Sequence, residues 1–180
     1  MHDPHLCALQ FDVTPLNYSG EIRIRSALDG RIINDNVARY RELNQKHLAP
    51  VSQGKTGHTV FLHTETNRSK YQIVMHAKTV VYQGEKRIRT AGEIQKAKGY
   101  MAEIFTLSVA ENTTCRLEKM VSIFTSLDDG IKNPRAAGRR ALSSIKSFSE
   151  VYQAHVRAWA GIWKIADIRI EGDRFMQKAA

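Results

Sequence analysis

The chain has 180 residues, a formal net charge of +9, 42% hydrophobic residues and 25% charged residues. This length suits one domain with its own core, and the composition is typical of a folded globular protein and excludes a disordered one. No stretch approaches the roughly 20 apolar residues of a membrane span, no signal-peptide pattern opens the chain, and two cysteines exclude a disulfide framework, so we expect a cytoplasmic protein.

The first part of the chain, up to about residue 127, is typical of short strands separated by turns. In Gly20–Ala27 isoleucines alternate with arginines, which is the period of a strand with one face in solvent. The dipeptide Asp29–Gly30 favours a tight hairpin turn, so a returning strand is expected over Arg31–Asn34. A polar excursion then reaches Gly57 and is too long and irregular for another hairpin loop.

Strand signals resume after this excursion, at Thr59–His63, Tyr71–Tyr82, Tyr100–Val109 and Arg116–Thr125. The apolar run Met101–Leu107 fits a helix or a strand, because a short run does not fix the period. Several strands at about ten-residue spacing favour an antiparallel β-sandwich over alternating βαβ units. We therefore predict a mainly β fold followed by a long C-terminal α-helix.

The C-terminal third has helical periodicity. Pro134 can occupy a first helical turn. Apolar and aromatic residues then recur every three or four positions, namely Ala141, Ile145, Phe148, Tyr152, His155, Trp159 and Trp163. This stripe predicts one amphipathic helix of roughly 30 residues. Beyond it, Ala166–Glu171 alternates like a strand, and Asp173 is a good N-cap for a further helix.

Motifs for metal binding or catalysis are absent from the sequence. The seven histidines show no ligand spacing, and Cys115 is expected to pack in a strand, so we predict no metal and no cofactor. Asp167, Glu171 and Asp173 cluster near the C-terminus, and glycoside hydrolysis requires a pair of carboxylates. A helix cap and solvent-exposed acids explain the same three residues, and we favour that interpretation.

Two binding functions remain as alternatives. A carbohydrate-binding module would need an aromatic platform, for which the candidates are Tyr18, Tyr40, Tyr71 and Tyr82. Nucleic-acid binding is disfavoured, because the positive charge is dispersed and no aromatics interleave with its densest cluster. That cluster consists of Lys86, Arg87, Arg89, Lys96 and Lys98.

Three ordered blocks of sequence carry more specific information. Residues 17–48 contain an N-x-x-G opening, a basic-flanked strand, S-x-L-D-G and a later H-L, and residues 118–127 read EKMVSIFTSL. Residues 155–177 fit the pattern W-x-x-x-W-x-x-x-D-[IV]-x-I-x-G-D-x-x-x-Q. Together the blocks resemble the sugar phosphorylases of glycoside hydrolase family 65. The residues in register in the third block are Trp159, Trp163, Asp167, Ile168, Ile170, Gly172, Asp173 and Gln177.

The resemblance implies an N-terminal β-sandwich of the galactose-mutarotase-like kind, a helical linker and a large (α/α)₆ barrel. It divides this chain into a partial sandwich at 1–130, a linker helix at 131–165 and a junction to an absent barrel at 166–180. The implied junction residues are Trp159, Trp163, Asp167, Glu171, Asp173 and Gln177. The general acid, a glutamate, and the phosphate-binding residues belong to the barrel, so no residue of this chain is assigned to catalysis.

The resemblance therefore leads us to expect a non-catalytic portion of an α-glucoside phosphorylase or hydrolase, inactive alone, that supports the barrel. Inorganic phosphate would be a co-substrate of the full-length enzyme. The expected partners are the barrel segment, a second copy in a homodimer and, in the full-length context, α-glucosides, with no membrane. A small active enzyme is the least favoured alternative.

Overall fold

The computed structural model describes residues 2–33, 46–88, 90–168, 170 and 172 of the chain. Within them lie nine strands and two helices. The strands are β1 Leu6–Val13, β2 Gly20–Asp29, β3 Leu48–Thr56, β4 Thr59–Thr66, β5 Gln72–Gln83, β6 Lys86–Ile88, β7 Glu93–Ala97, β8 Tyr100–Val109 and β9 Cys115–Thr125. The helices are α1 Pro134–Ser144 and α2 Phe148–Ala166.

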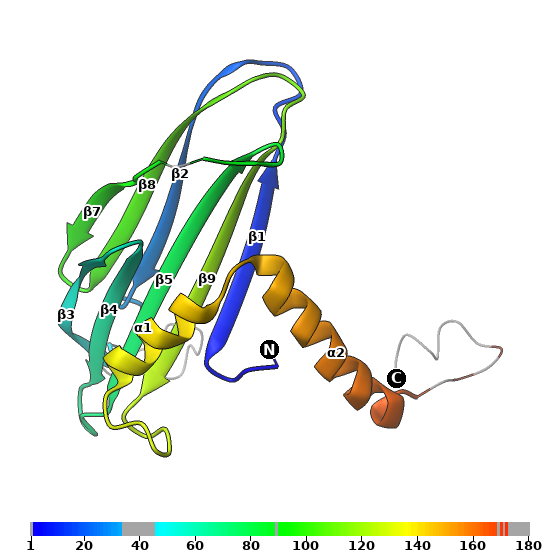
Figure 1. Ribbon diagram of the computed structural model, residues 1–180. Coiled ribbons are helices and arrows are strands. Elements are labelled where there is room, and N and C mark those ends of the chain that lie inside the picture. The colour runs from blue at the N-terminus through cyan, green and yellow to red at the C-terminus, as the bar shows by residue number, and fades with distance from the viewer. Residues whose placement is uncertain (1, 34–45, 89, 169, 171, 173–180) are drawn as a thin grey trace.

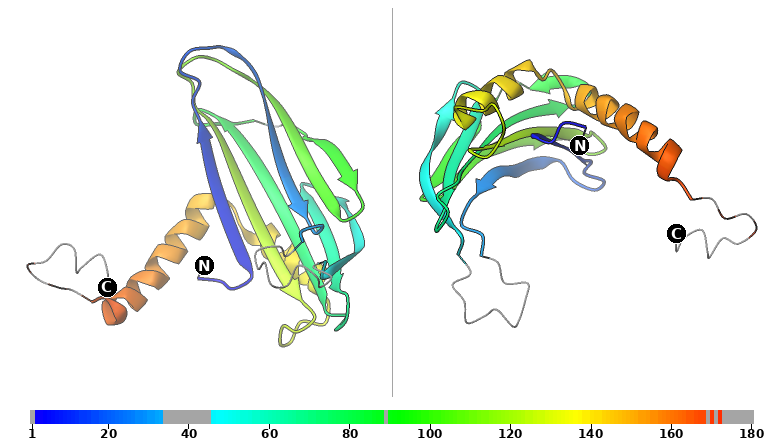
Figure 2. Two further views of the ribbon diagram at one scale, coloured as in Figure 1. Left: turned by 180° about the vertical axis from the view of Figure 1, so that it is seen from behind. Right: turned by 90° about the horizontal axis from the view of Figure 1, so that it is seen from below.

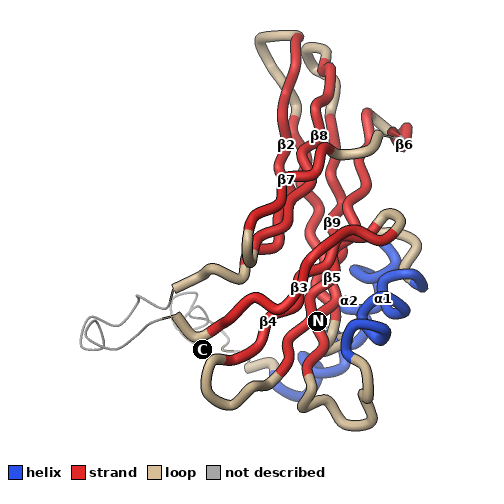
Figure 3. Tube along the Cα trace, turned by 90° about the vertical axis from the view of Figure 1, so that its left-hand side faces the viewer, coloured by secondary structure: helices blue, strands red, loops and turns tan. Residues whose placement is uncertain are grey.

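The strands form two antiparallel sheets that pack face to face, so the predicted sandwich is confirmed (Figure 1). The large sheet has the order β1-β9-β5-β4-β3, with β6 paired to the far end of β5. The small sheet has the order β2-β8-β7. Figure 2 shows that the large sheet is curved and that both helices lie on its outer, convex side. Figure 3 shows β2, β7 and β8 on the opposite side from the helices.

The main core lies between the two sheets. Leu62 and Leu117 from the large sheet are buried in the same apolar clusters as Met101 and Phe105 from β8. The run Met101–Leu107, whose period fits a helix or a strand, is therefore part of strand β8, and its inward-facing side chains are buried between the two sheets.

Polar contacts also join the two sheets. The hydroxyl groups of Ser26 and Thr79 lie 2.9 Å apart, and Lys119 Nζ donates a hydrogen bond of 2.6 Å to the carbonyl oxygen of Ala27. Burial lowers the pKa of Lys119. Because these groups would be costly to bury unpaired, they favour one alignment of the two sheets over others.

A second core lies between the large sheet and α1. Leu142 and Ala137 of α1 are buried against β5 and β9, whose residues Val80 and Met120 belong to the same layer. Ser122 Oγ donates a hydrogen bond of 2.9 Å to the carbonyl oxygen of Gly138. The central strand β9 is consequently buried on both faces.

The predicted hairpin at Asp29–Gly30 is wrong. β2 ends at Asp29 and pairs with β8, residues 31–33 form no strand, and Asn34 lies outside the described residues. The Gly30 amide donates to the Gly99 carbonyl oxygen at 2.9 Å, and a Cβ at Gly30 would lie 2.8 Å from the Thr64 side chain. The glycine therefore allows a close approach of the two sheets and does not make a reversal.

Four strands, β1, β3, β6 and β7, were not predicted from the sequence. β1 is the edge of the large sheet, and β3 lies inside the segment interpreted as a polar excursion. β3 joins β4 through a two-residue turn in which Gly57 has a φ of +59°, a conformation that favours glycine. β3 was not predicted because its sequence is polar and shows no hydrophobic alternation, whereas its register with β4 is fixed by this turn.

The predicted long C-terminal helix is confirmed as α2, but its predicted continuity from Pro134 is wrong, because the chain forms α1 and α2 with a break at residues 145–147. Ile145 leaves the helix with extended backbone and is buried, and its carbonyl oxygen accepts a hydrogen bond of 2.8 Å from Lys78 Nζ. Packing of Ile145 into the core therefore overrides the helical period. Downstream, Ala166 still belongs to α2, and residues 167, 168 and 170 form no strand, so the alternation expected over Ala166–Glu171 does not correspond to a strand in the described residues.

Candidate functional site

The start of α2 is fixed to the large sheet by polar contacts. Ser147 Oγ accepts from the Glu150 amide at 3.3 Å, and the Glu150 carboxylate accepts from the Lys146 amide at 2.9 Å. The Phe148 amide donates to Glu118 Oε2 of β9 at 3.1 Å. Ser147 and Glu150 have the spacing of a capping box, although Glu150 accepts from the amide before the N-cap, and the contacts of Ser147 and Glu118 satisfy amides that the first helical turn leaves unpaired.

Beyond this anchor, α2 leaves the sandwich. Val151 is its one buried residue, and the helix then runs away from the strands (Figure 1). Large apolar side chains are nevertheless exposed along it. Five of them lie along one side of the helix, and we call this set the α2 apolar face: Tyr152, Val156, Trp159, Ile162 and Trp163.

Neighbouring rings reinforce this face. The ring centroids of Phe148 and Tyr152 lie 5.7 Å apart and nearly parallel, those of His155 and Trp159 lie 5.8 Å apart, and those of Trp159 and Trp163 lie 6.2 Å apart. Exposed apolar patches of this kind mark interaction surfaces, since they gain free energy by leaving water. The arrangement offers a docking surface and contains no reactive group.

The predicted junction residues fall partly on this surface. Trp159 and Trp163 are both exposed, the latter by 56%, and the Asp167 amide donates to the Trp163 carbonyl oxygen at 2.9 Å as the C-cap of α2. Glu171, Asp173 and Gln177 lie outside the described residues. The assignment of these six residues to a domain junction therefore stays a prediction.

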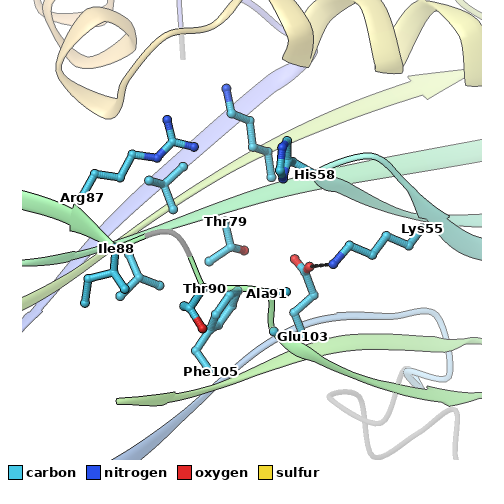
Figure 4. A pocket seen from close by; sticks show the side chains of 13 residues that line it. Lys55, His58, Thr79, Arg87, Ile88, Thr90, Ala91, Glu103 and Phe105 are labelled. Atoms are coloured by element: carbon cyan, nitrogen blue, oxygen red, sulfur yellow. Dashed lines mark ion pairs between the residues drawn. The ribbon is translucent and has the colours of Figure 1, made fainter. Parts of the chain in front are cut away.

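A pocket of about 660 Å³ opens between the two sheets. It lies where β5 passes from its partner β4, whose pairing ends at Lys78, to its partner β6, whose pairing begins at Val81. Figure 4 shows Lys55 and Glu103 pointing toward one another across it, with an Nζ–Oε1 distance of 2.9 Å. Arg87 lies on the opposite side of the pocket.

This pocket lacks the chemistry of a hydrolase. Glu103, whose side chain is 5% exposed, is the one carboxylate among the described residues that line it, and it is paired with Lys55. Glycoside hydrolysis needs two carboxylates. Lys78 also lines the pocket, but its Nζ is hydrogen-bonded on the helix side, and burial is the main cause that lowers its pKa. We interpret the Lys55–Glu103 pair as a further polar bridge between the sheets.

Neither Glu103 nor Lys55 was predicted as a site residue from the sequence. One signal was available, because Glu103 is a charged residue inside the apolar run of β8 and faces the other sheet. A buried acid of this kind needs a cation beside it. Lys55 could not be chosen as that cation, since its strand β3 was itself not predicted.

An aromatic platform for carbohydrate is not formed by the described tyrosines. Tyr71 and Tyr82 stand near opposite ends of β5, Tyr18 precedes β2, and Tyr40 lies outside the described residues. The buried Cys115 opens β9, as expected, and Cys7 is exposed. No group of three or more potential metal ligands occurs among the described residues, and no described helix is long and apolar enough to cross a membrane.

Comparison with known proteins places these features in context. The family model "Glycosyl hydrolase family 65, N-terminal domain" matches residues 1–162. An uncharacterized glycosyl hydrolase of Mycobacterium tuberculosis is 32% identical over 177 residues, which are 96% of this chain and 13% of that protein. Kojibiose phosphorylase of Thermoanaerobacter brockii is 28% identical over 98% of this chain, and the α,α-trehalose phosphorylase of the same organism is 26% identical over 97%.

The fold has a solved counterpart. The structure of a candidate kojibiose phosphorylase from the human microbiome superposes with a TM-score of 0.77 at 14% identity. That match covers 96% of this chain and 22% of the solved chain. The chain also spans about a quarter of the length of the two Thermoanaerobacter phosphorylases, 24% and 23%.

Proposed function

Because the chain belongs to glycosyl hydrolase family 65 and matches its N-terminal domain, we propose that it is a non-catalytic domain of an enzyme that phosphorolyses or hydrolyses α-linked glucosides. The names of its relatives support this reaction class, since kojibiose, α,α-trehalose and nigerose phosphorylases are among them. The absence of paired carboxylates from the large pocket supports a non-catalytic role for the described part of the chain.

The α2 apolar face is the observation that carries the proposal. A helix that contacts its own sandwich through one buried residue gains little from that contact, while its two indoles stay in water. An aromatic side chain buries about 150–250 Å² when covered, at about 25 cal/mol per Å². Covering both indoles would contribute several kcal/mol, so this face is suited to hold a catalytic domain.

The first experiment tests the non-catalytic role. The 180-residue chain is incubated with kojibiose, trehalose or maltose and inorganic phosphate, and the release of glucose 1-phosphate or glucose is followed. We expect neither product above a protein-free blank. Turnover that persists through repeated purification would contradict the proposal directly.

The second experiment tests the docking surface. Both tryptophans of the chain lie on α2, so selectively excited tryptophan fluorescence reports on this helix. In the isolated chain we expect emission typical of solvated indoles and efficient quenching by acrylamide. Indoles that are shielded in a monomeric chain would show that the face is already covered, and the docking role would be lost.

A chimaera tests whether the α2 apolar face becomes covered when a catalytic domain is present. This chain replaces the matching segment of the Thermoanaerobacter brockii kojibiose phosphorylase, and activity and indole emission are measured together. We expect a blue-shifted emission and an active enzyme, both weakened by the double substitution Trp159→Ala and Trp163→Ala. Arg157→Ala, an exposed change on the same helix, is the matched control and is expected to leave both signals unchanged.

A further inference from the structure

A second, smaller pocket of about 220 Å³ lies on the helix side of the large sheet, beside the first turns of α1. β3, β5, α1 and the N-cap of α1 contribute its walls. All of its lining side chains are cationic, neutral polar or apolar, with no carboxylate among them. The lining residues are Thr56, His76, Asn133, Arg135, Ala136 and Arg139.

His76 is buried at the base of this pocket. The residue is 3% exposed, and its Nδ1 has no hydrogen-bond partner. Nδ1 faces α1, since a Cβ placed on Gly138 would lie 2.6 Å from it. Burial, followed by the positive charges of Arg135 and Arg139, lowers the pKa of His76 to about 4, so the ring is neutral at neutral pH. A buried polar group without a partner is uncommon in folded proteins.

Among the residues that the structure describes, no carboxylate pairs with either arginine of the pocket. The Arg135 guanidinium stacks over the Phe61 ring at 3.9 Å from its centroid, and Arg139 follows one helical turn later. Neither forms an ion pair with a carboxylate among the described residues, and α1 has no acidic residue in its first turn. Like charges four residues apart on a helix destabilise it, and the positive end of the helix dipole adds to their field.

We propose that this pocket binds a tetrahedral oxyanion, as inorganic phosphate or as the phosphate group of a small ester, between the guanidinium groups of Arg135 and Arg139. Planar guanidinium groups bind phosphate oxygens through paired hydrogen bonds. The Asn133 amide and the Thr56 hydroxyl add neutral donors to the lining. The bound anion supplies the missing negative charge, and the site is independent of the non-catalytic role proposed for the domain.

The test is a titration of the ¹⁵N-labelled chain with inorganic phosphate, against sodium chloride at matched ionic strength. The His76 ring resonances are followed by NMR. We expect a saturable shift with phosphate and no saturation with chloride. The pKa of His76 should rise from its value of about 4, because a nearby anion favours the protonated ring.

Two single substitutions on the same helix separate a site from general attraction. Arg139→Gln removes a lining guanidinium and should weaken phosphate binding about tenfold or more, the scale of one charge-assisted contact. Arg140→Gln removes the same charge from the next residue, which is exposed like Arg139 but does not line the pocket, and should change the affinity less than about twofold. Equal effects of the two substitutions, or an unsaturable response, would overturn the proposal.

A second probe, glucose 6-phosphate, distinguishes the two sources of the anion. Tighter binding than inorganic phosphate assigns the pocket to a phosphate ester, and weaker binding assigns it to the free ion. Either result supports the oxyanion site, provided that Arg139→Gln weakens both probes. Glucose without phosphate should leave the His76 resonances unchanged, and a response to glucose equal to that of its phosphate would count against the site.

Discussion

Hydrophobic helices are usually more buried than polar ones, but the two helices of this chain show the opposite. α1 carries three arginines and no aromatic residue, yet it is packed on the large sheet through Ala137, Gly138 and Leu142. α2 carries two tryptophans, two further aromatics and several aliphatic residues, yet it buries Val151 alone. The small residues Ala137 and Gly138 let α1 approach the large sheet closely, and this close approach determines its docking. α2 is more hydrophobic, but beyond Val151 no surface of the described chain buries its side chains.

This difference separates two kinds of role. α1 is an integral layer of the domain, because its removal would expose Val80 and Met120 of the large sheet. α2 adds little to the domain that carries it and is suited to another surface. Substitutions that are equivalent in chemistry should therefore have unequal effects on the two helices.

The largest expected effect is at Leu142, which is 1% exposed in the layer between α1 and the sheet. Leu142→Ala should lower the free energy of unfolding by about 3 kcal/mol, because it removes buried methyl groups and leaves a cavity. Ile165→Ala on α2, where the side chain is 91% exposed, is the control and should cost less than about 0.5 kcal/mol. Chemical denaturation measures both, and similar costs at the two sites would remove the contrast between the helices.

The second effect is a dependence on pH at the interface between α1 and the large sheet, where His76 of β5 lies against Gly138. The pKa of His76 is lowered from 6.5 to about 4 in the folded chain, so unfolding binds a proton between these values. Stability is therefore full above about pH 6.5 and should fall by about 3 kcal/mol as the pH drops to 4, at 1.36 kcal/mol for each unit of pKa difference.

Denaturation of the His76→Gln variant over the same pH range provides the control. The variant lacks the titrating ring, so its stability should change much less across this window. Below about pH 4 the carboxylates Asp12, Asp29 and Asp128, whose pKa values are also lowered, begin to dominate both proteins. A steep loss between pH 6.5 and 4 in the variant as well would assign the transition to other groups.

Glycine offers a matched pair, with one residue in each helix. A Cβ at Gly138 would lie 2.6 Å from His76 Nδ1 and 3.0 Å from Ser122 Oγ, whereas nothing lies within 4 Å of a Cβ at Gly161. Gly138→Ala should destabilise the chain by about 1–3 kcal/mol through overpacking. Gly161→Ala should stabilise α2 by up to about 1 kcal/mol, because alanine is the better helix former. Thermal unfolding shows whether each substitution raises or lowers the stability. If both substitutions raised it, helix propensity would outweigh the overpacking expected at Gly138.

The smallest expected effect is at the α2 apolar face. In the isolated chain, Trp163→Ala should change the free energy of unfolding by less than about 1 kcal/mol, because this indole is already 56% exposed. Circular dichroism during denaturation would measure it. A cost near that of Leu142→Ala would mean that the indole packs on the domain.

Much of the fold follows from periodicity, and its failures have local causes. β5 and β9 were predicted because their apolar residues meet packed layers on both faces of the large sheet, and β8 because its apolar residues face the core between the two sheets. β3 was missed because its register depends on the turn at Gly57 and not on hydrophobic alternation. The break between the helices was missed because Ile145 fits the helical stripe, while Ser147 and Glu150 already have the spacing of a capping box.

The candidate sites were less accessible from sequence. The aromatic stripe of α2 was recognised, but its exposure depends on where the helix leaves the sheet. The small basic pocket joins Thr56, His76 and Arg139 from three separate elements, and no spacing in the chain connects them. The pairing of β3 with β4, the pairing of β4 with β5 and the docking of α1 bring these residues together.

The position of β9 also sets the order in which the domain can be assembled. Within the described chain β1 has β9 as its only sheet neighbour, with Leu6 opposite Ser122, so β1 is synthesised long before its partner exists. Local hairpins such as β3–β4 can form in the meantime, but the large sheet closes only after β9 has left the ribosome. Contacts this distant in sequence slow folding. Until β9 is available, the unpaired edge of β1 can pair with a strand of another nascent chain.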